Sequence, residues 1–262
     1  MNALSPGWHT DVAVARLGGS LVEEHADHLV VRTPGNPHYY WGNFLLVTDP
    51  TAVDDADRWL ARFVEVFPDS EHRAIGLVAA PDPAGWVAAG LVIELDDVLS
   101  TDVLPEQRQL AEGYVARPLA GDSDWDEHVR LDMLHNDRTD KREPVRHEAY
   151  LRLRTTSIRA LCEQGTAAWF GAFHDGVLVA DLGIVDCGAG IARYQSVGTD
   201  ADHRRRGLAG HLLGLAAHWA GDQGCTRWVI LTESDNPAGR LYRSLGFEEV
   251  VGNVQAFRKP HA

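Results

Sequence analysis

Cysteine is scarce in this chain. Its three cysteines, Cys162, Cys187 and Cys225, are widely spaced and form no Cys-x-x-Cys pair. An odd and scattered set gives no disulfide framework, so we expect a protein of the reducing cytoplasm. Two interpretations of these cysteines stay open: small buried hydrophobic side chains, or one catalytic thiol among them.

Long apolar runs are missing as well. No stretch of about 18 apolar residues occurs, which argues against a membrane-spanning helix, and residues 1–6 lack the basic and then apolar pattern of a signal sequence. Lysine occurs only at Lys141 and Lys259, and 24 basic side chains face 38 acidic ones, for a net charge of −14. Nucleic acids and anionic membranes bind basic patches, so we expect neither as a partner.

Two further kinds of site find no support in the sequence. The closest histidine pair, His25 and His28, has no acidic third ligand at a convincing spacing, so we expect no metal site. The Gly-x-Ser-x-Gly elbow of an α/β-hydrolase is absent, and so are the G-x-G-x-x-G and Gly-Lys-Ser/Thr loops of nucleotide-binding folds.

A glycine-bearing turn joins a strand to a helix in the second half. Residues 194–199 are strand-like, and from residue 208 apolar side chains recur at helical spacing. Between them lies Asp-His-Arg-Arg-Arg-Gly-Leu-Ala-Gly, residues 202–210. A helix start leaves backbone N–H groups unpaired at its positive dipole end, and Gly207 and Gly210 allow close approach. The sequence predicts a phosphate site here; helix–sheet packing for the glycines and solvation for the arginines stay open as alternatives.

Two motifs in this half resemble a known family. Arg204-x-x-Gly207-x-Ala209 resembles the [Q/R]-x-x-G-x-[G/A] pyrophosphate loop of the GNAT N-acetyltransferase superfamily. Residues 236–247, Asn-Pro-Ala-Gly-Arg-Leu-Tyr-Arg-Ser-Leu-Gly-Phe, are similar to the family's N-x-x-A-x-x-L-Y-x-x-x-G-F segment. The asparagine position of that segment falls on Asp235, so Asn236 stands one residue late, which bears on whether it contacts the cofactor. The resemblance covers residues 112–260.

The resemblance implies a cofactor and residues that bind it. The cofactor is acetyl-coenzyme A (acetyl-CoA). The backbone of Val197 and Thr199 is expected to pair with the pantetheine arm, between strands that splay apart near Thr199 and Arg227. The pyrophosphate is expected to lie on a loop that Arg204 begins, and Asn236 is expected to contact the cofactor. The backbone N–H groups assigned to the pyrophosphate belong to Arg205, Arg206, Gly207, Leu208, Ala209 and Gly210.

The resemblance also implies a direct transfer of the acetyl group. Tyr242 matches the family's tyrosine that serves the departing thiolate, and its alternative interpretation is a core aromatic side chain. The general base is not readable from the sequence. Glu233, just past a predicted strand, is the first candidate, and an exposed loop carboxylate is its equal alternative.

The order of elements in the first half repeats in the second. Each half gives a strand, a helix, a strand, a short helix and a strand, and Asp82-Pro-Ala-Gly85 corresponds to Asn236-Pro-Ala-Gly239. The first copy places Asp54 and Asp55 where a phosphate would sit, and like charges repel there. We therefore expect a degenerate GNAT-like domain without a coenzyme site over 1–108 and a GNAT acetyltransferase domain over 109–262. An unrelated α/β domain with a chance match stays the alternative for the first half.

The expected fold is α/β (α+β), with tandem GNAT-like lobes, each a mixed, mostly antiparallel sheet flanked by helices. Expected helices cover 54–67, 81–86 and 144–163 and begin near 122, 208 and 237. Expected strands cover 29–31, 38–47, 74–79, 91–95, 113–119, 167–173, 177–185, 191–199 and 227–232, with a hairpin turn at 174–176.

The function expected from the resemblance is acetyl-CoA-dependent N-acetylation of a primary amine, in a small molecule or a protein. A sensor or interaction module that binds acyl-CoA without turnover is the alternative. We expect a monomer or a homodimer, and aromatic residues 38–41 in the first half are candidates for lining the acceptor cleft, or simply core.

Overall fold

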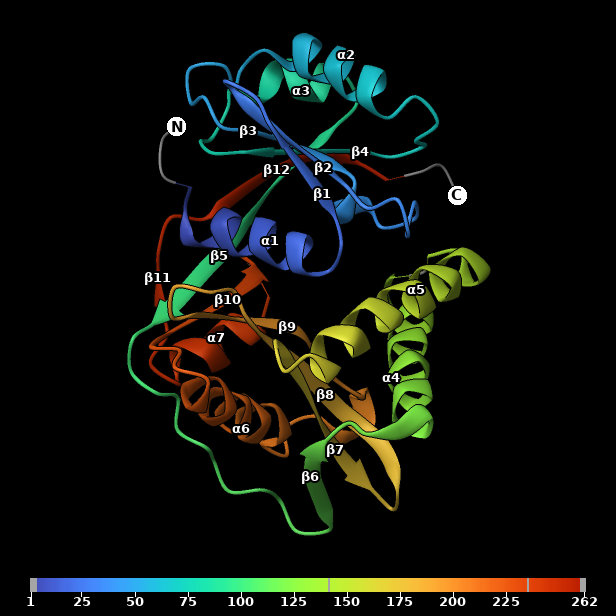
Figure 1. Cartoon of the computed structure of the whole chain (residues 1–262), viewed down its shortest axis with the longest axis vertical. Coiled ribbons are helices and arrows are strands. Elements are labelled where there is room, and N and C mark those ends of the chain that lie inside the picture. The colour runs from blue at the N-terminus through green and yellow to red at the C-terminus, as the bar shows by residue number, and fades with distance from the viewer. Residues whose placement is uncertain (1–3, 141, 235, 260–262) are drawn as a thin grey trace. The chain divides into compact units, whose positions relative to one another are not determined.

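The computed structural model describes residues 4–140, 142–234 and 236–259 (Figure 1). Asp235 therefore lies outside the described residues. The chain divides into two compact units. Unit 1 comprises residues 1–98, 231–239 and 249–262, and unit 2 comprises residues 99–230 and 240–248. The two units are described separately.

Unit 1 holds a mixed sheet with the strand order β1-β2-β3-β4-β12-β5. Neighbouring strands are antiparallel except for β3 and β4, which are parallel. Its strands are β1 (Leu21–Glu24), β2 (His28–Arg32), β3 (Phe44–Val47), β4 (Arg73–Leu77), β5 (Val92–Thr101) and β12 (Asn253–Arg258). Its helices are α1 (Pro6–Leu17), α2 (Ala56–Val66) and α3 (Pro83–Ala88), with a 3₁₀ turn η1 (Tyr40–Gly42).

The last strand of the chain completes the sheet of unit 1. Val254 of β12 pairs with Leu77 on one side and with Leu95 on the other, so β12 lies between β4 and β5 (Figure 1). Nothing in the sequence indicated this return of the chain. The domain division at residue 108 stays a prediction. The compact units differ from it because unit 2 begins at residue 99 and because residues 231–239 and 249–262 belong to unit 1.

Helix α1 is a core element that the sequence did not indicate. Ser5 caps it by accepting from the Trp8 N–H, and Pro6 stands in its first turn. The indole of Trp8 donates to the Leu77 carbonyl at 3.1 Å. A side chain on Gly76 would meet the Trp8 ring at 2.5 Å, so glycine is required for this helix to pack on β4.

The predicted strand over 38–47 is wrong in its first part. The chain makes the turn η1 there and becomes extended only from Phe44. The buried side chain of Asn43 explains this, because its oxygen accepts from the Thr33 N–H and its amide donates to the carbonyls of Asn36 and Tyr39. A side chain that satisfies backbone groups in this way stabilises a loop in competition with a strand. Trp41 packs against Trp8 and Phe44 in the core.

Unit 2 holds strands in the order β10-β9-β8-β7-β6. The strands β6 to β9 are antiparallel neighbours, whereas β9 and β10 are parallel. The strands are β6 (Tyr114–Pro118), β7 (Ala167–His174), β8 (Val177–Asp186), β9 (Ile191–Thr199), β10 (Arg227–Glu233) and the short β11 (Glu248–Glu249). The helices are α4 (Gly121–His135), α5 (Pro144–Glu163), α6 (Leu208–Asp222) and α7 (Ala238–Arg243), with a π-helical turn η2 (Asn136–Asp140) and a 3₁₀ turn η3 (Ala201–His203).

Most predicted elements of unit 2 are confirmed. The helix over Pro144–Glu163 has the predicted ends, and Asp175 and Gly176 turn β7 into β8 with φ values of 51° and 82°. Positive φ at both positions suits a tight hairpin turn. The prediction of mixed, mostly antiparallel sheets flanked by helices is confirmed. In the part of the chain that the structure describes, no helix has the length and apolar character needed to cross a membrane.

Candidate functional site

The first turn of α6 carries the predicted phosphate loop. Gly207 begins this helix with a φ of 78°, and no side chain caps it. Within the described residues, the N–H groups of Leu208, Ala209 and Gly210 find no acceptor, since the first bond of the helix runs from the His211 N–H to the Gly207 carbonyl. Three unpaired donors at the positive end of a helix form a site for an anion.

Around this loop the acidic side chains have charged partners within the protein, whereas three arginines have none in the described part of the chain. Arg204, Arg205 and Arg206 are exposed, and none of them has a carboxylate partner among the residues that the structure describes. The acidic side chains of the same loop are already neutralised, because Arg138 donates to Asp200 at 2.7 Å and to Asp202 at 3.1 Å. The carboxylate of Asp202, with that of Asp200, raises the pKa of Arg138. The loop therefore presents positive charge that the protein does not balance.

A fourth arginine reaches the same helix start from residues 102–113, the segment between β5 and β6. A side chain on Gly210 would lie 3.0 Å from Cδ of Arg108, whose guanidinium donates to Ser244 Oγ at 2.9 Å. The backbone of Gln107 lies so close to α6 that a side chain on Gly214 would meet it at 2.3 Å. Residues 107 and 108 thus form a strap that lies against α6. The strap was not predicted from the sequence, although the recurrence of Gly207, Gly210 and Gly214 along one side of the helix was an available signal.

Strand β9 leads into the loop and is irregular. Its parallel ladder with β10 covers only Ile191–Arg193 opposite Arg227–Val229, while β9 itself continues to Thr199. The predicted separation at Arg227 is therefore wrong, since Arg227 is paired with Ile191. Ser196 has a φ of 51°, and the register with β8 shifts between Asp181 and Gly183.

This geometry bears on the residues assigned to the pantetheine arm. On its β8 side, Gly198 opposes Asp181 and Thr199 opposes Ala180. The bulge lies next to Val197 and re-aims the backbone there. The cofactor contacts of Val197 and Thr199 stay predictions. They are consistent with the end of the β9–β10 ladder at Arg193, which leaves this part of β9 paired on its β8 side.

Tyr242 lies on α7 and is buried. It is 3% exposed and packs near Phe247, with ring centroids 6.5 Å apart. Burial raises the pKa of its phenol to about 12. A phenol of this kind keeps its proton at neutral pH, so Tyr242 is present as an O–H donor. Its role as the proton donor stays a prediction.

Asn236 and Glu233 belong to unit 1. Asn236 accepts from the Ala238 N–H at 3.0 Å and so caps the short helix α7. Glu233 is exposed at the end of β10, and its side chain has no hydrogen-bond partner among the described residues. The predicted roles of these two residues stay predictions.

The cysteines do not have the character of catalytic thiols. Burial raises the pKa of the Cys162 thiol to about 11 and that of Cys225 to about 12. Since the thiolate is the nucleophile, these two side chains are poor candidates for covalent catalysis.

A buried polar group in unit 2 was missed by sequence reasoning. Its members sit on α4, α5, β8 and β9 and form three contacts: His128 Nδ1 with Asp181 Oδ2 at 2.5 Å, His147 Nε2 with Asp132 Oδ1 at 2.9 Å, and an Arg154 guanidinium nitrogen with Ser196 Oγ at 3.0 Å. The one sequence signal was the spacing of His128 and Asp132, four residues apart on one face of a helix.

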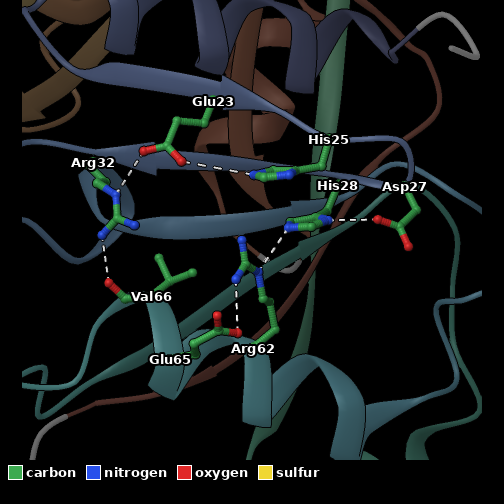
Figure 2. Close-up of polar contacts among 8 residues, drawn as sticks. All are labelled: Glu23, His25, Asp27, His28, Arg32, Arg62, Glu65 and Val66. Atoms are coloured by element: carbon green, nitrogen blue, oxygen red, sulfur yellow. Dashed lines mark hydrogen bonds and ion pairs between the residues drawn. The ribbon is translucent and has the colours of Figure 1, made fainter.

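Unit 1 has a polar cluster of a different kind (Figure 2). His28 Nδ1 donates to Asp27 at 2.7 Å, and its Nε2 accepts from Nε of Arg62 at 3.3 Å. This arrangement holds the imidazole neutral, and burial lowers its pKa. The His25 ring stacks on that of His28 with centroids 4.3 Å apart. Both nitrogens of His28 are engaged, so this side chain joins β2 to α2 and is no free base.

The helix in unit 1 that corresponds to α6 begins differently. Asp55 caps α2 by accepting from the Arg58 N–H, and Asp54 accepts from the Asp82 N–H at 2.7 Å. Both carboxylates predicted to exclude a phosphate are therefore occupied as structural acceptors at this helix start.

Comparison with known proteins adds the following. Residues 131–247 match the model of the Acetyltransferase (GNAT) family. None of the curated proteins compared with the chain matches it. Similar solved structures include a GCN5-related N-acetyltransferase from Kribbella flavida, another from Sphaerobacter thermophilus, and a tandem GNAT protein from the clavulanic acid biosynthesis pathway.

The similarity extends over nearly the whole chain. The Kribbella protein is 18% identical with a TM-score of 0.65, over 98% of each chain. The Sphaerobacter protein is 18% identical with a TM-score of 0.59, over 95% of this chain and 85% of the other. The tandem protein is 16% identical with a TM-score of 0.60, over 100% of this chain and 90% of the other. At such identities the likeness establishes the fold, and the N-terminal half is GNAT-like in fold as well.

Proposed function

Because residues 131–247 form a domain of the GNAT acetyltransferase family, we propose that this chain transfers the acetyl group of acetyl-CoA to a primary amine. Family membership supports acyl transfer in general. The cofactor and the acceptor class are our inference from the site in unit 2.

The observation that carries the proposal is the first turn of α6. Unpaired N–H groups at residues 208–210 and arginines without acidic partners (Arg204, Arg205 and Arg206) surround one helix start. In a chain of net charge −14, this cationic site fits the pyrophosphate of coenzyme A. Each hydrogen bond to a charged phosphate is worth about 1.5–3 kcal/mol, so several together hold the cofactor without a metal ion.

Arg108 adds to the same site. Its guanidinium is held by Ser244 beside Gly210 and lacks a carboxylate partner among the described residues. We assign it a contact with a phosphate of the cofactor. The strap that carries it is therefore part of the binding site as well as a connection between the halves.

The chemistry asked of the protein is modest. A neutral amine attacks the thioester carbonyl, the C–N bond forms and the C–S bond breaks, and the thiolate leaves with a proton. Tyr242 supplies that proton, because its raised pKa keeps the phenol protonated at neutral pH. Acetyl-CoA supplies the activated acyl group.

The N-terminal half, residues 1–108, is assigned no coenzyme site. The carboxylates of Asp54 and Asp55 occupy the start of α2 and would repel a phosphate there.

The test is thiol release from acetyl-CoA across a panel of primary amines, with calorimetric binding of coenzyme A in parallel. The proposal expects binding and turnover with at least one amine. Binding without turnover on any amine would favour a sensor or interaction module. Failure to bind coenzyme A would contradict the assignment of the loop.

A further inference from the structure

The pair formed by His128 and Asp181 is buried in unit 2. His128 on α4 and Asp181 on β8 are 7% and 6% exposed in their side chains, and their nearest atoms are 2.5 Å apart. The rings of Trp125 and Trp169 meet the imidazole edge-on, with centroids 5.9 and 6.0 Å away. A histidine and a carboxylate held this firmly in an apolar setting fix one orientation of the ring.

The pair lies against the irregular part of β9. Asp181 directly opposes Gly198 in the sheet, and its Oδ1 would be 3.5 Å from a side chain at Gly198. Gly198 stands between Val197 and Thr199, the residues assigned to the pantetheine arm. Two residues earlier, Ser196 forms the bulge. The carboxylate therefore lies beside the strand segment that is assigned to the pantetheine arm.

The other charged groups of this region have partners of their own. Asp132, one turn along α4, bonds to His147 of α5, and Arg154 of α5 donates to Ser196 Oγ. Nδ1 of His128 is used by Asp181, whereas Nε2 has no hydrogen-bond partner among the described residues. A neutral imidazole that donates from Nδ1 carries its lone pair on Nε2, where it can accept a proton.

We propose that His128 is the base that takes the proton of the acceptor ammonium, directly or through one water, and that Asp181 is its positioning residue. This proposal rests on the proposed function and replaces Glu233 as the base. The amine freed by this step attacks the thioester carbonyl. The nitrogen of the tetrahedral intermediate then loses a second proton to solvent, and Tyr242 regains from solvent the proton that it gives to the thiolate. His128 returns its own proton to solvent, so the net products are the amide, the thiol and one proton.

The experiment compares His128→Gln with a matched control. His147→Gln removes the imidazole from the other buried histidine–carboxylate pair of α4 and α5. With a working amine, His128→Gln should lower kcat/KM at pH 7 by about 10²–10⁴-fold and abolish the rise of kcat/KM with pH that reports the base. Coenzyme A affinity should stay unchanged. His147→Gln should keep the wild-type pH profile, even where it lowers the melting temperature.

Asp181→Asn provides a second test of the assignment if His128→Gln does not fold. It preserves the side-chain volume and removes the negative charge beside the imidazole, so the midpoint of the pH profile should move to lower pH. A wild-type pH profile in a folded His128→Gln, or an unmoved midpoint in Asp181→Asn, would overturn the assignment while leaving acetyl transfer intact. Absence of turnover in the wild type with every amine would overturn the proposed function itself, and this assignment with it.

Discussion

Asp55 closes the first turn of α2 with its own carboxylate, whereas Gly207 begins α6 without any side chain. Both helices follow a strand in a GNAT-like half of the same chain. In α2 the N–H groups of Ala56 and Arg58 have acceptors within the protein, and Asp54 adds a second negative charge. In α6 three donors are left for an outside anion. Glycine at the N-cap leaves the N–H groups of a helix start free for an anion, whereas aspartate at the N-cap accepts one of them with its own carboxylate.

The short helices α3 and α7 repeat this contrast. Each begins within a Pro-Ala-Gly segment, and Tyr242 stands three residues after Gly239. Three residues after Gly85 the first copy has Ala88. The N-terminal half therefore lacks both the phosphate loop and a counterpart of the tyrosine. This is the pattern expected of a domain that binds no coenzyme.

The largest expected effect comes from giving α6 the charge that α2 has. Gly207→Glu forces a non-glycine residue into a φ of 78° and places a carboxylate at the pyrophosphate. We expect coenzyme A affinity to fall at least about 100-fold, the equivalent of one or two lost charged hydrogen bonds. Titration calorimetry measures this, and a melting curve checks that the chain still folds. Affinity within a few-fold of wild type would remove the loop from the site.

Tyr242→Phe tests the contrast between α7 and α3 through catalysis. Phenylalanine keeps the ring, so packing against Phe247 is retained and coenzyme affinity should change little. Loss of the phenolic proton should lower kcat by about 10²–10⁴-fold, with Ala88→Tyr as a control that brings no gain. Steady-state kinetics with the first working amine decide; a wild-type kcat with rate-limiting chemistry would make Tyr242 a packing residue.

Mild acid should weaken the chain through buried histidines of unit 1. Burial lowers the pKa of His28 and of His72, so both rings resist protonation in the folded chain. Below about pH 6.5 these two histidines bind protons in the unfolded chain more readily than in the folded chain. Stability that is complete above that pH is therefore lost as the pH falls, by up to about 1.4 kcal/mol per pH unit for each histidine.

Urea unfolding at pH 7.5, 6.5 and 5.5 measures this loss. His28→Asn should flatten the dependence, because asparagine can still donate to Asp27 but does not titrate. An unfolding free energy that is constant over this range in the wild type would contradict the neutral state of both rings.

The smallest expected effect is on the helix start of unit 1. Asp55→Ala removes the cap of α2 and should lower the unfolding free energy by about 1 kcal/mol. Coenzyme A affinity should not change, because this helix start has no assigned ligand. A loss of affinity here, measured by calorimetry, would show that the two helix starts are not functionally distinct.

Local patterns predicted most of the fold. Apolar spacing and caps indicated α2, α5 and α6, and the Asp-Gly pair indicated the turn between β7 and β8. Helix α1 was missed because its buried side chains, among them Trp8 and Val12, do not form a clear apolar stripe. The placement of β12 was missed for a different reason: which strands pair is decided by the whole sheet and leaves no local signal.

Part of the candidate site was likewise predicted from local sequence patterns, and part was not. The loop at 204–210 was readable because a backbone anion site needs glycine at fixed positions. The contact of Arg108 with the start of α6 and the pairing of His128 with Asp181 join residues far apart in the chain. Side chains of this kind come together only through the fold, so neither contact could be predicted from spacing.

The central claim is that one half of the chain holds the cofactor and the other does not. Titration of coenzyme A into the full chain by calorimetry tests it most directly, with Gly207→Glu and Asp55→Ala measured alongside. We expect one site per chain in the wild type, one in Asp55→Ala, and none in Gly207→Glu. Two sites per chain, or binding that survives Gly207→Glu and is lost in Asp55→Ala, would contradict it.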